Sequence, residues 1–389
     1  MTGQRDIATL LVQDDLASGP VVPPIHQSSL FTFDDVAQMA ATFAGENDRP
    51  VYSRGNNPTV RVFEQKMAML EGGEAARGFA SGMAAISASI LAFAQSGDRI
   101  VCVRHVYPDT YRFMRRLLPR LGIETSFVDG RDLDAMRKAL DGAALLYLES
   151  PTSVVFETHD IAEQARLARE AGAVSIIDNS WATPVFQRPL ALGVDIVVHS
   201  ASKYVSGHSD TVAGVAIGAR ERIDRINTLT YPFLGGKLAP FEAWLLLRGL
   251  RTLTLRLRRH DESVTRVAGW LQAREEVERV HLPEISNRPG GLSGRAGLFS
   301  IELRDGVDPV RFCDALDLFR LGVSWGGHES LCFPMAVGLR QAGEHNSLVD
   351  FGVPQQLVRL HVGLEEPDDL MADLDRAFAT VNTNIQGSP

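Results

Sequence analysis

Lys203 is the residue whose surroundings most strongly suggest covalent chemistry. It lies in the segment IVVHSASKYVSGHSD, which passes from an apolar run into a turn of small and polar residues. Ser200 and Ser202 stand beside it, and Asp210 follows. Ligands of open α/β sheets bind beyond the carboxyl ends of the strands, where this segment is expected to lie. A lysine amine in such a place could form a Schiff base with an aldehyde.

Two further segments contain groups that would complement this amine. The run VSIIDNSWA ends its apolar stretch at Asp178, and RGFASGMAAISASILAF passes through Ser81 and Gly82 into an expected helix. Amides at a helix N-terminus bind phosphate. A carboxylate can keep the ring nitrogen of a pyridine cofactor protonated. Each residue alone has an ordinary structural interpretation as a turn, cap or solvated residue, so the prediction rests on the combination.

Together these segments predict a site for pyridoxal 5'-phosphate. The cofactor needs an amine for its aldehyde, amide or hydroxyl donors for its phosphate and a carboxylate for its ring nitrogen. Lys203 provides the amine and Asp178 the carboxylate. The residues expected to contact the cofactor are Gly82, Met83, Asp178, Ser200, Ser202 and Lys203.

Motifs for other cofactors are absent from the sequence. No GxGxxG joins a strand to a helix, which disfavours a nicotinamide oxidoreductase, and P-loop, GxSxG and HExxH motifs are missing. Cys102, Cys313 and Cys332 lie far apart without CxxC spacing, so neither disulfides nor a metal site is expected. A catalytically silent protein that retains the fold is disfavoured because Lys203 and Asp178 are both present.

The composition limits the class of protein. The 389 residues are 45% hydrophobic, which is typical of a globular chain with one large and one smaller domain. The formal net charge of -9 argues against a nucleic-acid partner. Neither a secretory leader nor a run of roughly 18 apolar residues is visible, so we expect a cytoplasmic protein without a membrane partner. The basic run RGLRTLTLRLRR (248–259) is expected to be the solvated side of a helix.

Short apolar runs alternate with amphipathic stretches in the middle of the chain. The expected strands are residues 99–103, 145–148, 174–177 and 196–198. The expected helices are residues 83–93, 110–121, 132–140 and 160–171. Continuous apolar strands separated by helices imply a mainly parallel sheet that is covered on both faces.

The two ends of the chain differ from this central pattern. Residues 1–60, rich in Pro, Ser and Asn, predict an extended arm that packs on a second subunit. Residues 61–245 would form the cofactor-binding domain and residues 246–389 a smaller α+β domain. The strands expected in the smaller domain are residues 298–303, 323–324 and 358–362. The helices expected towards the end of the chain are residues 240–273, as one long helix or two, 309–319 and 367–381.

Ordered blocks of sequence resemble the cysteine and methionine metabolism family of pyridoxal-phosphate enzymes, also called the trans-sulfuration family. The blocks are YSRGNNPT (52–59), LEGG (70–73), SGMAAI (81–86), ESPTS (149–153), DNSWATP (178–184), SASKYVSGHSD (200–210), PFEAWLLLRGLRTL, SWGGHESL and VRLHVGLEEPDDL. They cover nearly the whole chain in family order. The resemblance implies the aspartate aminotransferase-like fold of type I and a homotetramer built from two tight dimers.

The resemblance also implies roles for residues that the pattern alone does not single out. Tyr107 would stack on the cofactor ring and help to move a proton. Tyr52 and Arg54 would reach the phosphate bound to the neighbouring subunit. Lys203, once displaced by substrate, would act as the base. The substrate would be bound by Ser153, Ser324 and Arg359, with the arginine on its carboxylate.

Local features within the family blocks resemble the cystathionine β-lyases. These features are Ser153, Trp181 and Trp325, together with Val323 where γ-acting members commonly carry Glu. We therefore expect a carbon–sulfur lyase that cleaves cystathionine or a related sulfur amino acid to a keto acid, ammonia and a thiol. YSRGNNPT is closer to the γ-acting members, so cystathionine γ-synthase, γ-lyase and γ-replacement of the O-acyl-homoserine sulfhydrylase type remain alternatives.

Overall fold

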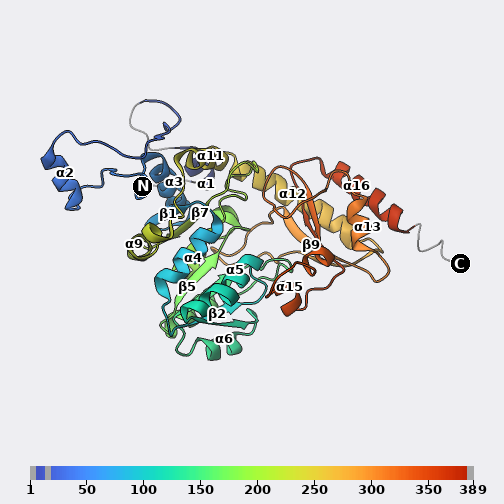
Figure 1. The fold of residues 1–389 in the computed structure, drawn as a ribbon. Coiled ribbons are helices and arrows are strands. Elements are labelled where there is room, and N and C mark those ends of the chain that lie inside the picture. The colour runs from blue at the N-terminus through green and yellow to red at the C-terminus, as the bar shows by residue number, and fades with distance from the viewer. Residues whose placement is uncertain (1–5, 14–18, 383–389) are drawn as a thin grey trace.

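The computed structural model describes residues 6–13 and 19–382. A large sheet and a smaller sheet, each packed against helices, lie side by side, and an N-terminal arm carrying α2 (Val36–Phe43) projects from the larger part (Figure 1). The large sheet is mainly parallel and the small sheet is mainly antiparallel. The predicted α/β fold with a smaller α+β part is confirmed.

The large sheet has seven strands in the order β1-β7-β6-β5-β4-β2-β3. All of these strands run in one direction except β7, which is antiparallel to β1 and β6 on either side of it. The strands are β1 (Ala75–Phe79), β2 (Arg99–Val103), β3 (Glu124–Val128), β4 (Leu145–Glu149), β5 (Val174–Asp178), β6 (Ile196–His199) and β7 (Gly214–Gly218). The central strands read as continuous apolar runs because helices cover both faces of the sheet. All four strands predicted in this region exist.

Helices surround this sheet. They are α3 (Pro58–Glu71), α4 (Gly82–Phe93), α5 (Pro108–Arg112), α6 (Leu133–Leu140), α7 (Ile161–Glu170), α8 (Thr183–Phe186), α9 (Arg220–Leu229) and α10 (Tyr231–Leu234). The helix predicted over residues 110–121 is only partly α-helical. A π-helix (Phe113–Leu117) and a 3-10 helix (Leu118–Leu121) follow α5, because Pro119 has no amide hydrogen to continue an α-helix. A further 3-10 turn covers Pro189–Leu192.

The smaller sheet has five strands in the order β10-β11-β12-β9-β8. They are β8 (Val277–His281), β9 (Leu298–Leu303), β10 (Arg320–Leu321), β11 (Leu331–Pro334) and β12 (Leu357–His361). The helices of this part are α12 (Leu253–Gln272), α13 (Pro309–Asp314), α14 (Met335–Gly338), α15 (Ser347–Asp350) and α16 (Pro367–Asn382). Helix α11 (Pro240–Leu250) precedes them and packs on α3 of the larger part.

Two predictions for this part are wrong. Residues 323–324 form no strand, because β10 ends at Leu321 and the chain then turns toward the large sheet. The helix predicted over residues 309–319 ends at Asp314. The backbone amides of Asp317, Leu318 and Phe319 donate to the carboxylate of Asp373 instead of continuing the helix.

The described part of the arm is not wholly extended, contrary to the prediction. It contains α1 (Ile7–Val12) and α2, and each helix begins at an aspartate cap. Asp6 accepts a hydrogen bond from the amide of Ala8, and Asp35 accepts one from the amide of Gln38. Helices of 6 and 8 residues span too few turns to produce a clear periodic signal.

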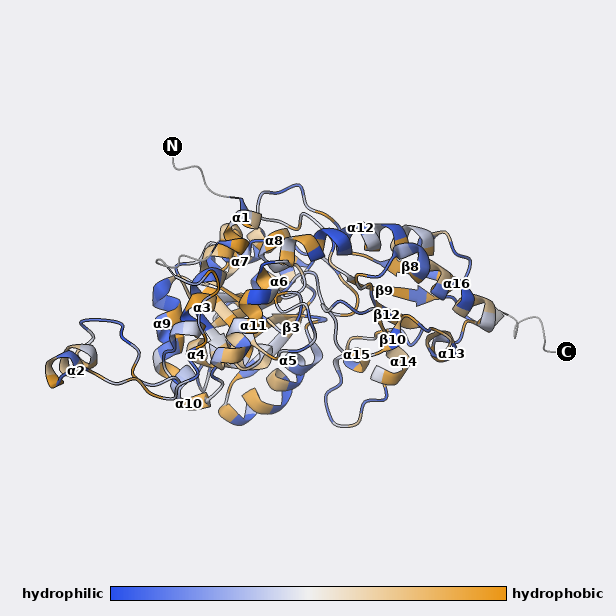
Figure 2. Cartoon of the chain, turned by 90° about the horizontal axis from the view of Figure 1, so that it is seen from above, coloured by the Kyte–Doolittle hydropathy of each residue, from blue (hydrophilic) through white to orange (hydrophobic). Residues whose placement is uncertain are grey.

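The basic run 248–259 is also not uniformly solvated. Arg256 on α12 is buried, and its guanidinium donates to the carbonyl oxygens of Tyr204 and Gly249, each at 2.8 Å. It therefore supports the turn that follows Lys203. Hydropathy varies around the helices, with hydrophobic and hydrophilic residues on different sides (Figure 2). Among residues 6–13 and 19–382, no helix is long and apolar enough to cross a bilayer.

Candidate active site

A pocket of about 1300 Å³ lies between the carboxyl ends of the large-sheet strands and the smaller sheet. It brings together ten of the predicted site residues. They are Gly82, Met83, Tyr107, Ser153, Asp178, Ser200, Ser202, Lys203, Ser324 and Arg359. This position agrees with the rule that ligands of open α/β folds bind beyond the strand ends.

Lys203 stands in the turn after β6. Its Nζ donates to Ser324 Oγ at 2.7 Å and lies 5.2 Å from the centroid of the Trp325 ring. Burial, followed by the positive charge of Arg359, lowers the pKa of Lys203 to about 8, while Asp178 acts in the opposite direction. A larger fraction of the amine is therefore neutral at physiological pH than in a solvated lysine, as a nucleophile or base requires.

Asp178 ends β5 and faces the same pocket. Its Oδ1 accepts hydrogen bonds from the amide of Ser180 at 2.9 Å and from the hydroxyl of Ser180 at 2.6 Å. Burial raises the pKa of Asp178, whereas the Ser180 hydrogen bonds and the charge of Lys203 lower it. Ser180 thus orients the side chain. The Ser180 hydrogen bonds and Lys203 favour its charged form, whereas burial disfavours it.

Glu149 is a pocket residue that the sequence analysis did not assign. It ends β4, and its carboxylate accepts from the amide of Tyr107 at 2.8 Å and from the hydroxyl of Ser153 at 2.6 Å. Burial, followed by the charge of Asp178, raises the pKa of Glu149 to about 8. The sequence contains a signal that indicates Glu149 as a site residue, because Glu149 ends the apolar run LLYLE just as Asp178 ends VSIID.

The N-terminus of α4 forms one wall of the pocket. Ser81 caps it by accepting from the amide of Ala84 at 3.1 Å, so the amides of Gly82 and Met83 begin the helix without intrahelical partners. A Cβ on Gly82 would lie 2.8 Å from Cβ of Ser200 and 2.9 Å from its Oγ. Only glycine permits this close packing, which places the Ser200 hydroxyl beside the helix terminus.

Ser202 is less free than its predicted role suggests. Its hydroxyl donates to the carbonyl oxygen of Ala213 at 3.1 Å and accepts from the amide of Ala213 at 2.9 Å. These bonds join the turn around Lys203 to the segment before β7. A contact between Ser202 and a phosphate stays a prediction.

Tyr107 precedes α5 and is about 40% exposed. Its hydroxyl donates to Oδ2 of Asp109 at 2.9 Å, and Oδ1 of Asp109 accepts from the guanidinium of Arg112. Burial, followed by the charge of Asp109 and its hydrogen bond, raises the pKa of Tyr107 to about 12. The side chain is therefore a phenol that holds its proton.

Arg359 projects from β12 toward the pocket. Its Nη2 donates to the carbonyl oxygen of Val323 at 2.8 Å, and its guanidinium lies 5.5 Å from the centroid of the Phe333 ring. Burial lowers the pKa of Arg359 to about 10. No carboxylate in the described part of the chain forms an ion pair with it, so its planar donor set is suited to an incoming carboxylate.

Tyr52 and Arg54 are not brought to the pocket within one chain. Tyr52 is half exposed, and the Arg54 guanidinium lies 5.9 Å from the centroid of its ring. Nη1 of Arg54 donates to the carbonyl oxygen of Pro232 at 3.2 Å. The role of both residues at a neighbouring subunit stays a prediction.

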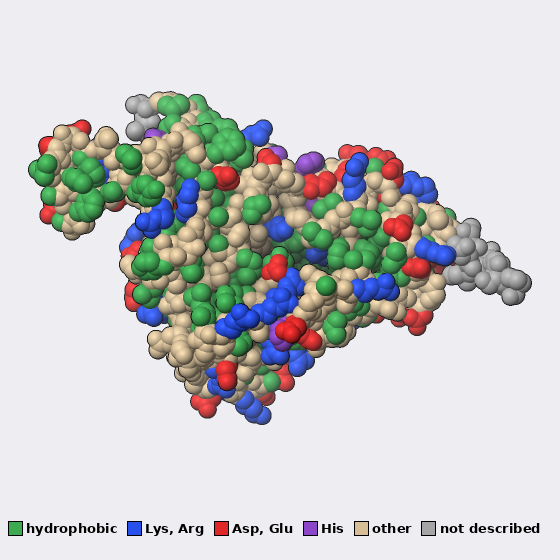
Figure 3. Space-filling view, viewed as in Figure 1, with side chains coloured by type: hydrophobic (Ala, Val, Ile, Leu, Met, Phe, Trp, Pro, Cys, Tyr) green, Lys and Arg blue, Asp and Glu red, His purple; other side chains and the backbone are tan. Residues whose placement is uncertain are grey.

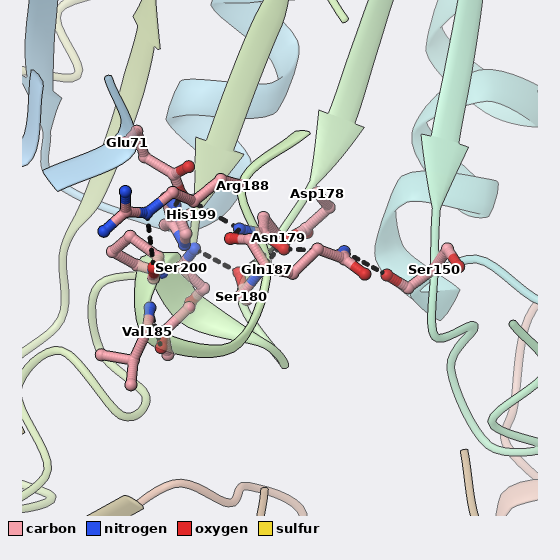
Figure 4. Close-up of polar contacts among 12 residues, drawn as sticks. Glu71, Ser150, Asp178, Asn179, Ser180, Val185, Gln187, Arg188, His199 and Ser200 are labelled. Atoms are coloured by element: carbon pink, nitrogen blue, oxygen red, sulfur yellow. Dashed lines mark hydrogen bonds and ion pairs between the residues drawn. The ribbon is translucent and has the colours of Figure 1, made fainter. Parts of the chain in front are cut away.

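A buried polar network lies behind Asp178, beyond the ends of β4, β5 and β6 (Figure 4). Oε1 of Glu71 lies 2.6 Å from Nε2 of His199 and accepts from the amide group of Asn179 at 3.0 Å. The side chain of Gln187 donates to Asn179 Oδ1 at 3.0 Å and to the carbonyl oxygen of Ser150 at 2.8 Å. The network links three strand ends to the last residue of α3.

Comparison with known proteins identifies the family. The family model described as "Cys/Met metabolism PLP-dependent enzyme" matches residues 8–379. The chain belongs to this family. It is 39% identical to L-methionine gamma-lyase of Pseudomonas putida over 369 residues, covering 92% of this chain and 93% of that protein. It is 34% identical to cystathionine beta-lyase of Lactococcus lactis over 375 residues, covering 94% and 96%.

A solved structure shows the same fold. The cystathionine gamma-lyase from Lactobacillus plantarum complexed with L-serine has a TM-score of 0.89 and 34% identity, and the match covers 97% of this chain and 100% of that one. This neighbour confirms the predicted type I fold, and the family confirms the predicted cofactor, pyridoxal 5'-phosphate.

The residues of the pocket fit this cofactor. The α4 N-terminus, with no Cβ on Gly82, provides room and amide donors for a phosphate, Asp178 provides a carboxylate, and Lys203 provides the amine. When bound, pyridoxal phosphate supplies an electron sink for carbanions at the α carbon of an amino acid. The assignment of each residue to its part of the cofactor stays a prediction that the geometry supports.

Proposed function

We propose that the protein is a carbon–sulfur lyase that cleaves L-cystathionine, or a related sulfur amino acid, by β-elimination. The observation that carries this proposal is the position of Lys203, with a lowered pKa, in a pocket that also holds Asp178 and Arg359. This combination can bind an amino acid by its carboxylate and remove its α-proton. Family membership supports the same chemistry.

Each side chain then has a defined task. Arg359 binds the substrate carboxylate with its guanidinium and so fixes the α carbon near Lys203. The neutral Lys203 amine accepts the α-proton. Asp178 keeps a negative charge at the inner end of the pocket. As the carbon–sulfur bond breaks, the sulfur leaves as a thiolate, and the phenol of Tyr107 or the protonated Lys203 returns a proton to it.

The choice of the β carbon is supported by the lining of the outer pocket. Val323 lines the pocket and is 78% exposed, and the family resemblance implies a glutamate at this position in γ-acting members. Trp181 is buried, and its Nε1 donates to the carbonyl oxygen of Leu298 at 2.9 Å, which fixes the ring at the pocket wall. Trp325 packs against Tyr204 beside Lys203, with ring centroids 5.4 Å apart.

A γ-lyase that acts on L-methionine is the second candidate. The 39% identical relative from Pseudomonas putida carries that name. The outer wall of the pocket includes Phe333, Met335 and Val337, which could accommodate a methylthio group as readily as the stem of cystathionine. Both candidates use Lys203, Asp178 and Arg359 in the same way.

Product analysis separates the candidates. With L-cystathionine and no added nucleophile, β-elimination releases pyruvate, whereas γ-elimination releases 2-oxobutyrate. We expect mainly pyruvate, and little methanethiol from L-methionine. Predominant 2-oxobutyrate would reject β-elimination, and efficient joining of an O-acyl-homoserine to cysteine would indicate γ-replacement. Absence of any keto acid or thiol from sulfur amino acids would reject the lyase proposal itself.

We further propose a cytoplasmic homotetramer with an arm (1–60), a cofactor domain (61–245) and a C-terminal domain (246–389). The arm supports this assembly because α2 projects from the body with hydrophobic side chains on its surface (Figure 3). Val36 and Phe43 on α2 are 81% and 67% exposed, and Phe233 on α10 is 79% exposed. Large apolar surfaces of this kind usually mark subunit contacts. Sedimentation velocity should give four times the chain mass.

A further inference from the structure

The loop Ser324–Gly327 packs directly on the backbone of Lys203. Gly326 has φ +87°, and a Cβ there would lie 2.8 Å from the amide nitrogen of Tyr204 and 2.9 Å from Cα of Lys203. The same loop supplies Ser324, whose Oγ accepts from Lys203 Nζ at 2.7 Å. Movement of the loop would therefore move both the backbone and the amine of the lysine.

A buried histidine holds this loop. His361 is the last residue of β12 and is 1% exposed. The amide of Gly326 donates to Nε2 of His361 at 3.0 Å, and Nδ1 lies 2.9 Å from the carbonyl oxygen of Glu329. Because Gly326 can only donate and the Glu329 carbonyl can only accept, one tautomer satisfies both bonds, with its proton on Nδ1.

The surroundings keep this imidazole neutral. A second proton on Nε2 would face the amide proton of Gly326 and break that bond. Burial lowers the pKa of His361 to about 3, with Arg359 and Lys203 acting in the same direction and the Glu329 carbonyl in the opposite one. His260 packs against it with ring centroids 5.5 Å apart and also has its pKa lowered by burial.

Strand β12 contacts the chain just before the loop and again within it. Arg359 donates to the carbonyl oxygen of Val323, just before the loop, at 2.8 Å. His361, two positions further along the same strand, accepts from Gly326 within the loop. Because β12 lies between β11 and β9, these bonds fasten the loop to a central strand of the smaller sheet.

We propose that His361 is a positioning residue for Lys203. As a neutral imidazole it fastens the loop Ser324–Gly327 to β12, so that the lysine amine is held against Ser324 and Trp325 while Arg359 is held on the same strand. His361 does not line the pocket. It acts through the loop, and its ring also packs against Tyr204, with centroids 6.0 Å apart. The inference rests on the proposed function for the catalytic use of Lys203, but the loop restraint itself does not.

Three substitutions separate the two hydrogen bonds from simple packing. His361→Gln keeps an acceptor that can reach the amide of Gly326. His361→Asn keeps a donor toward Glu329 but is too short to reach Gly326. His361→Phe keeps the ring volume and loses both bonds. His260→Phe is the matched control for packing, because His260 is equally buried, packs against both His361 and Tyr204, and bonds to the carbonyl oxygen of Val362, at 2.9 Å, instead of to the loop.

The first readout needs no cofactor. Hydrogen exchange of the Gly326 amide, followed by mass spectrometry of the cofactor-free protein, should become about tenfold faster in His361→Phe and His361→Asn, because a buried amide loses its acceptor. His361→Gln should exchange within about threefold of wild type, and His260→Phe should match wild type in this segment. Equal exchange rates of the Gly326 amide in wild type and His361→Phe would overturn the proposal that His361 restrains the loop.

The second readout uses the holoenzyme. His361→Phe should lower kcat by about tenfold with a smaller change in KM, and should alter the visible circular dichroism of the lysine-bound cofactor, because the amine loses its fixed position. His361→Gln should recover most of both signals. The same losses in His260→Phe would reduce His361 to a packing role. If the wild-type protein shows no visible absorption from a bound cofactor, the proposed function fails. The hydrogen-exchange result still tests whether His361 restrains the loop.

Discussion

Glu149 and Asp178 end neighbouring parallel strands and lie in register across β4 and β5. Burial raises the pKa of each carboxyl group, and the charge of Asp178 raises that of Glu149 further, to about 8. Hydrogen bonds from Ser180 and the nearby charge of Lys203 act in the opposite direction on Asp178. A pKa of about 8 leaves Glu149 mostly protonated at neutral pH, whereas the contacts with Ser180 and Lys203 favour the charged form of Asp178.

This asymmetry predicts different outcomes for two isosteric substitutions. Glu149→Gln replaces an uncharged acid with an uncharged amide, so kcat/KM should fall by less than about threefold. Asp178→Asn removes the charge that would stabilise a protonated ring nitrogen, so kcat/KM should fall by about 100-fold or more. Steady-state kinetics on both variants test this. Equal losses would show that the charge is not confined to Asp178.

Lys203→Ala should abolish turnover and remove the visible absorption of the bound cofactor. No other amine in the described part of the chain lines the pocket, so no substitute can bind the aldehyde. The stability of the cofactor-free protein should change by no more than about 1 kcal/mol, since only one side-chain hydrogen bond is lost. Spectroscopy and urea unfolding measure the two effects, and turnover at the wild-type rate would reject the assignment.

The sequence predicts those site residues that carry a recognisable local signal. Lys203 and Asp178 each follow an apolar strand, and Gly82 begins a periodic helix, so strand ends and a helix start locate them. Arg359 and Tyr107 needed the family resemblance, because an arginine in a strand or a tyrosine in a loop has many ordinary explanations. All of these residues line one pocket.

Other features depend on contacts that are distant in sequence. The end of α13 is set by Asp373, which lies 56 residues beyond Asp317. Arg256 is buried because carbonyl oxygens from a turn 52 residues earlier and from α11 accept its protons. The bond between His361 and Gly326 spans 35 residues. Local periodicity contains no information about such partners, so these features could not be predicted from it.

The pKa of Lys203 predicts how cofactor binding depends on pH. Only the neutral amine reacts with an aldehyde, so the rate at which cofactor-free protein binds pyridoxal phosphate should rise up to about pH 8 and then level off. Arg359→Ala removes a positive charge that disfavours the protonated amine, so the midpoint should move to higher pH. Stopped-flow absorbance across the pH range measures both midpoints.

Arg340→Ala provides the control for this experiment. Arg340 is an exposed arginine of the same pocket, and it is not among the groups that shift the pKa of Lys203. The midpoint should stay at its wild-type value in this variant. An equal shift in Arg340→Ala and Arg359→Ala would indicate a general effect of net charge on the pocket.

The buried network predicts a large loss of stability in Glu71→Ala. Glu71 and His199 are both fully buried and lie 2.6 Å apart, and Asn179 donates to the same carboxylate oxygen. Removing the carboxylate leaves Nε2 of His199 without its partner and leaves the Asn179 amide with only its bond to the carbonyl oxygen of Gln187, which should cost about 3 kcal/mol. Urea unfolding of the cofactor-free protein measures this cost. Glu262→Ala, on an exposed position of α12, should change stability by less than about 0.5 kcal/mol.

The last prediction concerns Arg54, which does not reach the pocket of its own chain. If Arg54 completes the site of a neighbouring subunit, Arg54→Ala should weaken cofactor retention, and mixing it with Lys203→Ala should restore activity. In a hybrid dimer of a two-fold interface, one pocket combines an intact Lys203 with an intact Arg54, and the other pocket carries both lesions. When the two variants are mixed in equal amounts and their subunits reassort at random, the mixture should have roughly a quarter of wild-type activity. If Arg54 instead acts within its own chain, every pocket of the hybrid contains one lesion, and hybrids verified by mass spectrometry will show no recovery.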